Sequence, residues 1–120
     1  MIIINWRKIQ MGIYLGITFN SEKYLETKER LENHAKFFHK DLKMKLFVSL
    51  EEFKDYINKI DCSNIDRIVL YDCVELGNLE QFKEFSNLCS QYRLEYSLIN
   101  ENVDLHSDVD IPLPYLFSVF

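Results

Sequence analysis

The stretch Asp66–Val103, DRIVLYDCVELGNLEQFKEFSNLCSQYRLEYSLINENV, sets the architecture because it contains a strand, a helix and a second strand in succession. Arg67–Tyr71 is nearly all apolar, as is typical of a central strand in a parallel sheet. Leu79–Tyr92 carries apolar residues at helical spacing, and Leu94–Ile99 is again rich in strand-forming residues. This order predicts a βαβ unit with parallel strands.

The same alternation holds in the chain before this stretch. Gly12–Phe19 is a β-rich apolar run, and Asn20–Ser21 can cap a helix over Glu22–His39. Met44–Val48 is predicted to be a strand, and Ser49–Glu52 is a capping box that begins another helix. We therefore expect an α/β domain with a mostly parallel sheet of four to five strands and helices on both faces.

The helical spacing also predicts which side chains face the sheet. They are Leu31, Ala35 and Phe38 in the first helix, Phe53, Tyr56, Ile57 and Ile60 in the second, and Phe82, Phe85, Leu88, Cys89 and Tyr92 in the third. The opening residues 1–10 have no place in this alternation, so we expect an extra edge strand or an arm there.

Length and charge limit the functions that this chain can have. Its 120 residues correspond to one domain, and 14 basic against 19 acidic residues give a net charge of −5. Such a balance argues against direct binding to nucleic acid. No apolar run approaches the ~20 residues of a membrane span. Met1–Asn5 is apolar but too short for a secretory signal. We expect a cytoplasmic protein.

Several kinds of site are disfavoured by spacing. Glycines occur only at Gly12, Gly16 and Gly77, so neither phosphate-binding glycine motif can be written. The three cysteines have no C-x-x-C spacing, and we interpret them as reduced thiols. His34 and His39 lie five residues apart, which is wrong for one helical face. We expect no metal and no cofactor, and interpret the carboxylates of Asp104, Asp108 and Asp110 as a solvated loop.

Ligand sites in parallel sheets form beyond the carboxyl ends of the strands. In this sequence those positions are Thr18–Ser21, Asp72–Asn78 and Asn100–Val103. One hypothesis is therefore a small-ligand-binding or sensor domain. Its pocket would be built around Thr18, Asn20, Asp72 and Asn100.

The segment Asp66–Val103 also resembles the central part of the serine recombinase (resolvase/invertase) catalytic domain. That family has an "LDRLGR" turn where this chain has Cys73–Asn78, and an "xSLTExID" phrase where it has Ser97–Asp104. The family's "YxRVS" strand corresponds to Tyr14–Thr18, and its "TPxGRLxFxIF" segment to Asp110–Phe120. The resemblance covers almost all of residues 12–120 and implies a resolvase-like, flavodoxin-like three-layer fold.

The departures from that family fall on its chemistry, in which a serine attacks a DNA phosphodiester and arginines neutralise the phosphate. The serine position holds Thr18, and the arginine positions hold a glycine, a glutamate, an asparagine and a proline. The degenerate positions are Gly16, Thr18, Val74, Glu75, Asn78 and Pro114. A carboxylate such as Glu75 repels phosphate. The resemblance therefore implies a domain without recombinase activity.

In the family, the stretch matching residues 111–120 begins a dimerisation helix, which would be truncated here. Its apolar residues are our candidate interaction surface: Tyr115, Leu116, Phe117, Val119 and Phe120. We expect a regulatory protein of a phage or mobile element that contacts a recombinase or a host protein, or forms a homodimer. A remaining alternative is an enzyme that uses Thr18 with Asp72 and Glu101.

Overall fold

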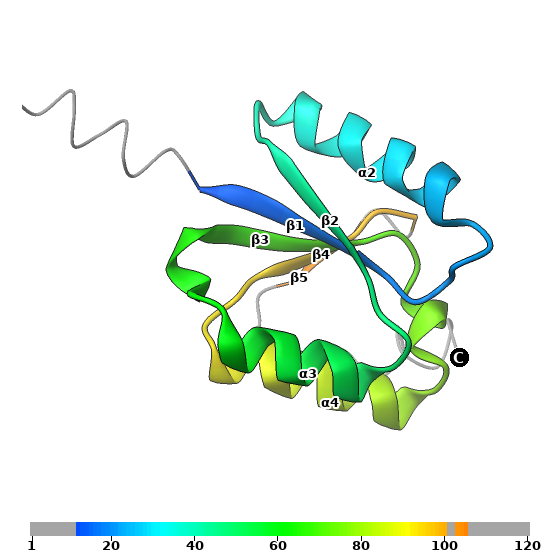
Figure 1. Cartoon of the computed structure of the whole chain (residues 1–120), viewed down its shortest axis with the longest axis vertical. Coiled ribbons are helices and arrows are strands. Elements are labelled where there is room, and N and C mark those ends of the chain that lie inside the picture. The colour runs from blue at the N-terminus through cyan, green and yellow to red at the C-terminus, as the bar shows by residue number, and fades with distance from the viewer. Residues whose placement is uncertain (1–11, 101–102, 106–120) are drawn as a thin grey trace, which may run out of the picture.

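A computed structural model describes residues 12–100 and 103–105 of the chain (Figure 1). Within this part, the strands are β1 (Ile13–Thr18), β2 (Leu42–Leu46), β3 (Ile65–Leu70), β4 (Tyr96–Leu98) and β5 (Val103–Leu105). The helices are α2 (Tyr24–Phe37), α3 (Leu50–Lys59) and α4 (Leu79–Gln91), with 3₁₀ turns η1 (Cys62–Asn64) and η2 (Cys73–Leu76).

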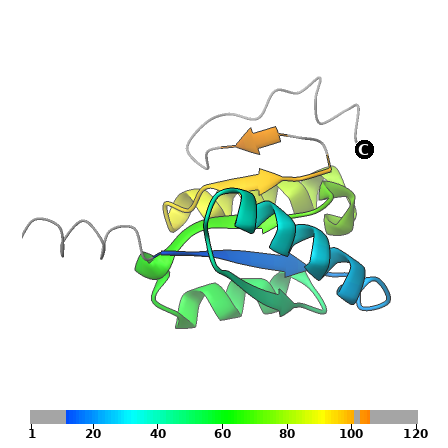
Figure 2. The same ribbon diagram turned by 90° about the horizontal axis from the view of Figure 1, so that it is seen from above.

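The five strands form one sheet in the order β2-β1-β3-β4-β5. The first four in this order are parallel, and β5 runs antiparallel to β4 at the far edge (Figure 2). The expected α/β class is thus confirmed, with the strand order of flavodoxin-like folds. The order reverses between β1 and β3, because the chain goes from β1 outward to β2 and then returns past β1 to β3. That reversal is where such sheets usually bind ligands.

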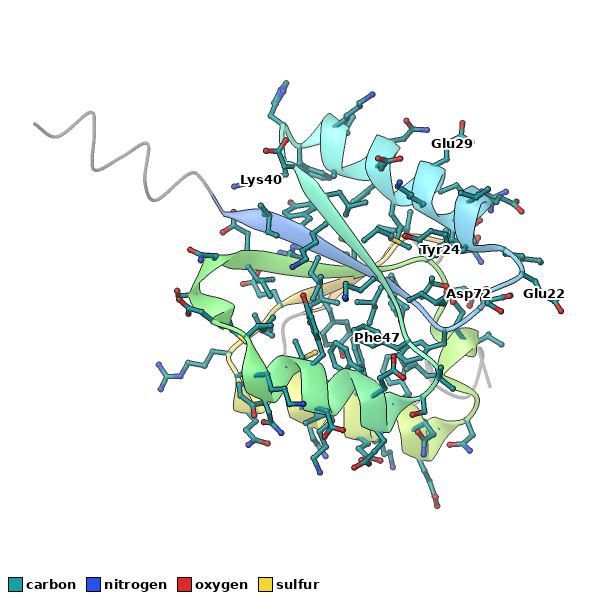
Figure 3. The ribbon with its side chains drawn as sticks, viewed as in Figure 1. Glu22, Tyr24, Glu29, Lys40, Phe47 and Asp72 are labelled. Atoms are coloured by element: carbon teal, nitrogen blue, oxygen red, sulfur yellow. The ribbon has the colours of Figure 1, made fainter. Side chains whose placement is uncertain are left out.

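Helices cover both faces, with α2 on one side and α3 and α4 together on the other (Figure 1). On the α3–α4 side the ring of Phe85 lies 5.4 Å from that of Phe53 and 5.2 Å from that of Tyr96, and all three side chains are buried. Phe47, from the loop after β2, joins this core (Figure 3). On the other side Leu31 and Ala35 of α2 pack in a smaller core over the sheet. The three layers follow from these two buried faces.

Side-chain caps begin α3, where the sequence predicts one at Ser49, and α4, where Asn78 was not predicted as a cap. The Ser49 hydroxyl accepts from the backbone N–H of Glu52 at 3.3 Å, and Asn78 caps α4 by accepting from Gln81 at 2.9 Å. Asn20 accepts from the two residues before α2, so it orders the turn that leads into the helix. Regular α2 therefore begins later than the expected Glu22.

Three expectations need correction. The second strand was expected at Met44–Val48 but spans Leu42–Leu46, because it is an edge strand that includes Lys43 and Lys45. The ammonium groups of these two lysines lie over the Tyr56 ring on the α3 side. Phe38 is 46% exposed because α2 ends at Phe37. Asp104, which we expected in a solvated loop, lies in strand β5.

Some expectations fall outside the described residues. These are the arm or edge strand at residues 1–10, the helix start at residues 111–120 with its apolar side chains, and the positions Glu101, Asp108, Asp110 and Pro114.

Candidate functional site

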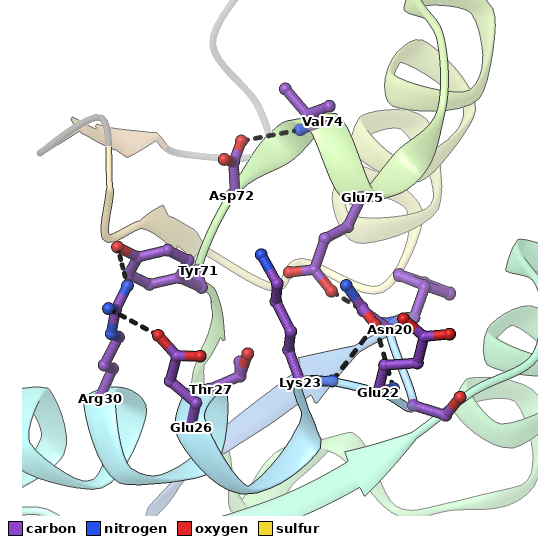
Figure 4. A pocket seen from close by; sticks show the side chains of 12 residues that line it. Asn20, Glu22, Lys23, Glu26, Thr27, Arg30, Tyr71, Asp72, Val74 and Glu75 are labelled. Atoms are coloured by element: carbon purple, nitrogen blue, oxygen red, sulfur yellow. Dashed lines mark hydrogen bonds and ion pairs between the residues drawn. The ribbon is translucent and has the colours of Figure 1, made fainter.

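A cleft of about 570 Å³ lies at the carboxyl ends of β1 and β3, at the reversal in strand order (Figure 4). Its floor and walls come from the loop after β1, the first two turns of α2 and the loop after β3. The lining residues are Phe19, Asn20, Ser21, Glu22, Lys23, Glu26, Thr27, Arg30, Tyr71, Asp72, Val74 and Glu75. Both the position and the volume are typical of small-molecule sites.

One wall is fixed by a hydrogen bond between the end of β1 and the 3₁₀ turn η2. The hydroxyl of Thr18, at the end of β1, donates to Oε1 of Glu75 in η2. The same oxygen accepts from the backbone N–H of Phe19 at 3.0 Å. The hydroxyl oxygen of Thr18 in turn accepts from the backbone N–H of Asn20 at 3.2 Å. Thr18 is 0% exposed, so its hydroxyl is buried with both its donor and its acceptor capacity in use.

The opposite wall is built by α2. Arg30 places its guanidinium carbon 4.7 Å from the centre of the Tyr71 ring and donates to the Tyr71 hydroxyl. It also pairs with Glu26, one helical turn earlier, at 2.8 Å. The spacing of Glu26 and Arg30 puts both side chains on the helix face that meets the cleft. Arg30 is therefore held by partners within the site.

The loop after β3 completes the site through a short chain of hydrogen bonds. Tyr71 donates to Oδ1 of Asn100 at 3.2 Å, and Asn100 donates to Asp72 at 3.3 Å. The other carboxylate oxygen of Asp72 accepts from the backbone N–H of Val74 at 3.0 Å and starts η2. Gly77 ends η2 with a φ of 96°, which a glycine adopts without strain. The wall is thus ordered before any ligand binds.

The structure brings together part of the site expected from sequence. Asn20 and Asp72 line the cleft, and Thr18 and Asn100 support it through hydrogen bonds. The hydroxyl of Thr18 bonds to Glu75, which the enzyme alternative of Thr18 with Asp72 and Glu101 did not include. Three of the side chains that sequence reasoning missed are Lys23, directly before α2, and Glu26 and Arg30 within it. Their helical spacing, on the first helix after a strand end, was the signal available.

Three other positions that depart from the recombinase pattern, Gly16, Val74 and Asn78, lie in the part of the chain that the structure describes. Gly16 lies under α2, where an added Cβ would come within 2.9 Å of Met44 Sδ and 3.2 Å of Leu31 Cδ1. The space that a larger residue would need is filled by apolar side chains. Val74 is half exposed at the rim of the cleft. Asn78 is the cap of α4.

The lining of the cleft is acidic on balance, with four carboxylates and two cations. Glu26 and Arg30 neutralise each other, which leaves Glu22, Asp72 and Glu75 against Lys23. A phosphate group would meet repulsion here. Over residues 12–100 and 103–105, no three histidine, cysteine, aspartate or glutamate side chains converge to hold a metal ion.

The thiols with described environments are poor nucleophiles. Burial raises the pKa of Cys89 far above its ordinary value, and the neighbouring Cys62 raises it further. Partial burial, followed by the charge of Asp61, raises the pKa of Cys62 as well. Both therefore stay protonated at neutral pH and are not activated thiols.

No helix in the described residues is long and apolar enough to cross a membrane. Comparison of the chain with protein families, with curated proteins and with solved structures gives no match.

Proposed function

We propose that the chain is a catalytically inactive recombinase-like domain that acts through contact with another protein. The hydroxyl environment of Thr18 carries this proposal. A strand-cleaving enzyme needs an accessible nucleophile and cations around the phosphate. Here the hydroxyl is buried and donates to a carboxylate, Glu75. The acidic lining and the net charge of −5 add to the case against phosphate chemistry.

A cleavage assay tests the first half of the proposal. Supercoiled plasmid would be incubated with the protein, with Thr18→Val and with the double variant Thr18→Ser/Glu75→Arg. We expect no nicked or linear product from any of them, because the remaining arginine positions are also lost. Nicking by the wild type that disappears in Thr18→Val would refute the assignment as an inactive domain.

Exposed apolar side chains at the cleft end of the molecule support the second half, contact with another protein. Leu25 is 77% exposed, Val48 86% and Val74 52%. Each follows the carboxyl end of a parallel strand, so all three lie at the same end of the molecule as the cleft. Exposed apolar side chains at one end of a molecule supply apolar area that contact with a partner can bury. Within the proposal, this end and the segment Tyr115–Phe120 form the surface for a recombinase or host protein of a phage or mobile element, in the cytoplasm.

Two sets of variants test the contact. A protein captured from source cells would be produced separately, and its affinity measured by calorimetry for the wild type, Leu25→Ser/Val48→Ser and a Tyr115–Phe120 deletion. Phe37→Ser is the matched control, since Phe37 is 78% exposed at the opposite end of α2. We expect Leu25→Ser/Val48→Ser and the Tyr115–Phe120 deletion each to lose at least tenfold in affinity. Phe37→Ser should bind as the wild type does. Unchanged binding in both would exclude this surface.

The cleft itself favours a second candidate, a small-ligand-binding or sensor domain. It lies at the strand-order reversal, holds about 570 Å³ and has walls already ordered by hydrogen bonds. A thermal-shift screen with nucleotides, flavins and small metabolites tests this candidate. The absence of stabilisation by any compound would count against it.

A further inference from the structure

Lys23 and Glu75 keep binding capacity that the internal network of the cleft does not use. The walls occupy Arg30, Tyr71 and Asp72 with hydrogen bonds among themselves and their neighbours. In contrast, Lys23 makes no side-chain hydrogen bond or ion pair in the described structure, and its amino group reaches into the cleft toward the space between Tyr71 and Glu75 (Figure 4). Glu75 uses Oε1 for both of its hydrogen bonds. Its Oε2 remains available to a ligand.

Lys23 and Glu75 carry opposite charges but do not pair with each other. Lys23 comes from the residue that precedes α2, and Glu75 from η2 after β3, so the two groups stand on different walls of one cleft. A ligand between them can meet both. Its anionic group would face the Lys23 ammonium, and its cationic group would face the Glu75 carboxylate.

We propose that the cleft binds a small zwitterion with the chemistry of a free α-amino acid. This inference rests on the ligand-binding candidate and names its ligand class. A purely anionic ligand would meet the carboxylates of Glu22, Asp72 and Glu75, and a purely cationic ligand would meet Lys23. An amino acid separates its two charges by a few ångströms, and its side chain would lie against the apolar lining of the cleft.

The remaining lining sets the environment of that side chain. Phe19 and Val74 supply apolar surface, and the ring of Tyr71 is held in place by the Arg30 guanidinium. The volume of about 570 Å³ exceeds what an amino acid fills, so side chains of every size can enter. We therefore expect the class of ligand to be set by the two charges, and the side-chain preference by this apolar surface.

Matched probes separate the two charges. The ¹⁵N-labelled full chain would be titrated with each of the twenty free amino acids by NMR. The tightest binder would then be compared with its amide, which keeps only the cation, and with its N-acetyl form, which keeps only the anion. We expect each single-charge probe to bind about five- to tenfold more weakly than the amino acid, because each loses one charged contact.

Variants assign the two contacts. Lys23→Met should weaken the amino acid about five- to tenfold and leave its amide unaffected, and Glu75→Gln should do the same with the N-acetyl form unaffected. Glu75→Gln keeps an acceptor for Thr18, and its fold is checked by its amide spectrum. Lys36→Met and Glu84→Gln are matched controls, because both residues are exposed and lie outside the cleft.

Three results would overturn the proposal: no binding of any amino acid, equal binding of the three matched probes, or unchanged affinity in both cleft variants. If amino acids fail while a nucleotide or flavin raises the melting temperature, the ligand-binding candidate stands and only the zwitterion is refuted. If no small molecule of either kind binds, both fail.

Discussion

Replacing Glu75 by alanine should destabilise the fold, although Glu75 lies in the short 3₁₀ turn η2 and not in the core. Its carboxylate accepts from the Thr18 hydroxyl and from the Phe19 backbone N–H, 57 and 56 residues away in sequence. A hydrogen bond to a charged group contributes about 1.5–3 kcal/mol net. The Thr18 hydroxyl is fully buried, so loss of the carboxylate leaves its proton without an acceptor. We therefore expect a loss of about 2–4 kcal/mol in the free energy of unfolding.

Urea unfolding followed by far-ultraviolet circular dichroism measures this loss as a change in midpoint at constant slope. Glu75→Gln keeps the acceptor and should cost no more than about 1 kcal/mol. Glu84→Ala is the control, because Glu84 is exposed in α4 and makes no described contact, and should stay within ~0.5 kcal/mol of the wild type.

A double-mutant cycle isolates the contribution of the pair. Thr18→Val removes the donor, so Glu75→Ala in that background should cost less than it does alone. The coupling expected for residues in direct contact is about 0.5–3 kcal/mol. If Glu75→Ala alone is indistinguishable from the Glu84→Ala control, the hydrogen bond does not hold η2 against the end of β1, and the account of the cleft wall is wrong.

Three other predictions concern single residues. Cys89, with its raised pKa and full burial, should resist iodoacetamide at pH 8 in the folded protein and react only after unfolding, as read by peptide mass spectrometry. Gly16→Ala should cost about 1–3 kcal/mol in urea unfolding, because its Cβ would crowd Met44. The Ser63 hydroxyl, then the Ser63 backbone N–H, lowers the pKa of Asp61. The ionised Asp61 carboxylate therefore stabilises the fold, and this effect is lost as pH falls through the pKa of Asp61 in the folded protein. Ser63→Ala should raise the pKa of Asp61, as measured by an NMR titration.

The order of elements could be predicted because it depends on local patterns. Apolar runs such as Arg67–Tyr71, helical spacing in Leu79–Tyr92 and the Ser49 cap each act over a few residues. The errors arose where tertiary context overrides the pattern. Strand β2 lies at an edge, where lysines are favoured because they discourage pairing with other chains, so its apolar signal is weak. Strand β5 has only three residues, too few for a periodicity.

The location of the cleft could be predicted from the sequence, but the hydrogen bonds that build its walls could not. The rule that ligands bind beyond strand ends located Asn20 and Asp72 correctly. The bond between Thr18 and Glu75 depends on two facts that local sequence does not contain. One is the strand order, in which β3 lies beside β1 on the inner side of the sheet and β2 lies at the edge. The other is the path of η2, which brings Glu75 to the end of β1.

The glutamate at position 75 therefore has two consequences that cannot be separated. A carboxylate there opposes a phosphate, and the same carboxylate supplies the acceptor that the buried Thr18 hydroxyl and the Phe19 N–H need. An arginine side chain has only hydrogen-bond donors. In Glu75→Arg, the Thr18 hydroxyl and the Phe19 N–H, both donors, would therefore face another donor instead of an acceptor. Restoring the cation would then disturb the wall of the cleft before it created a phosphate site. The acidic residue is part of how this cleft is built, and any function of the cleft has to use it.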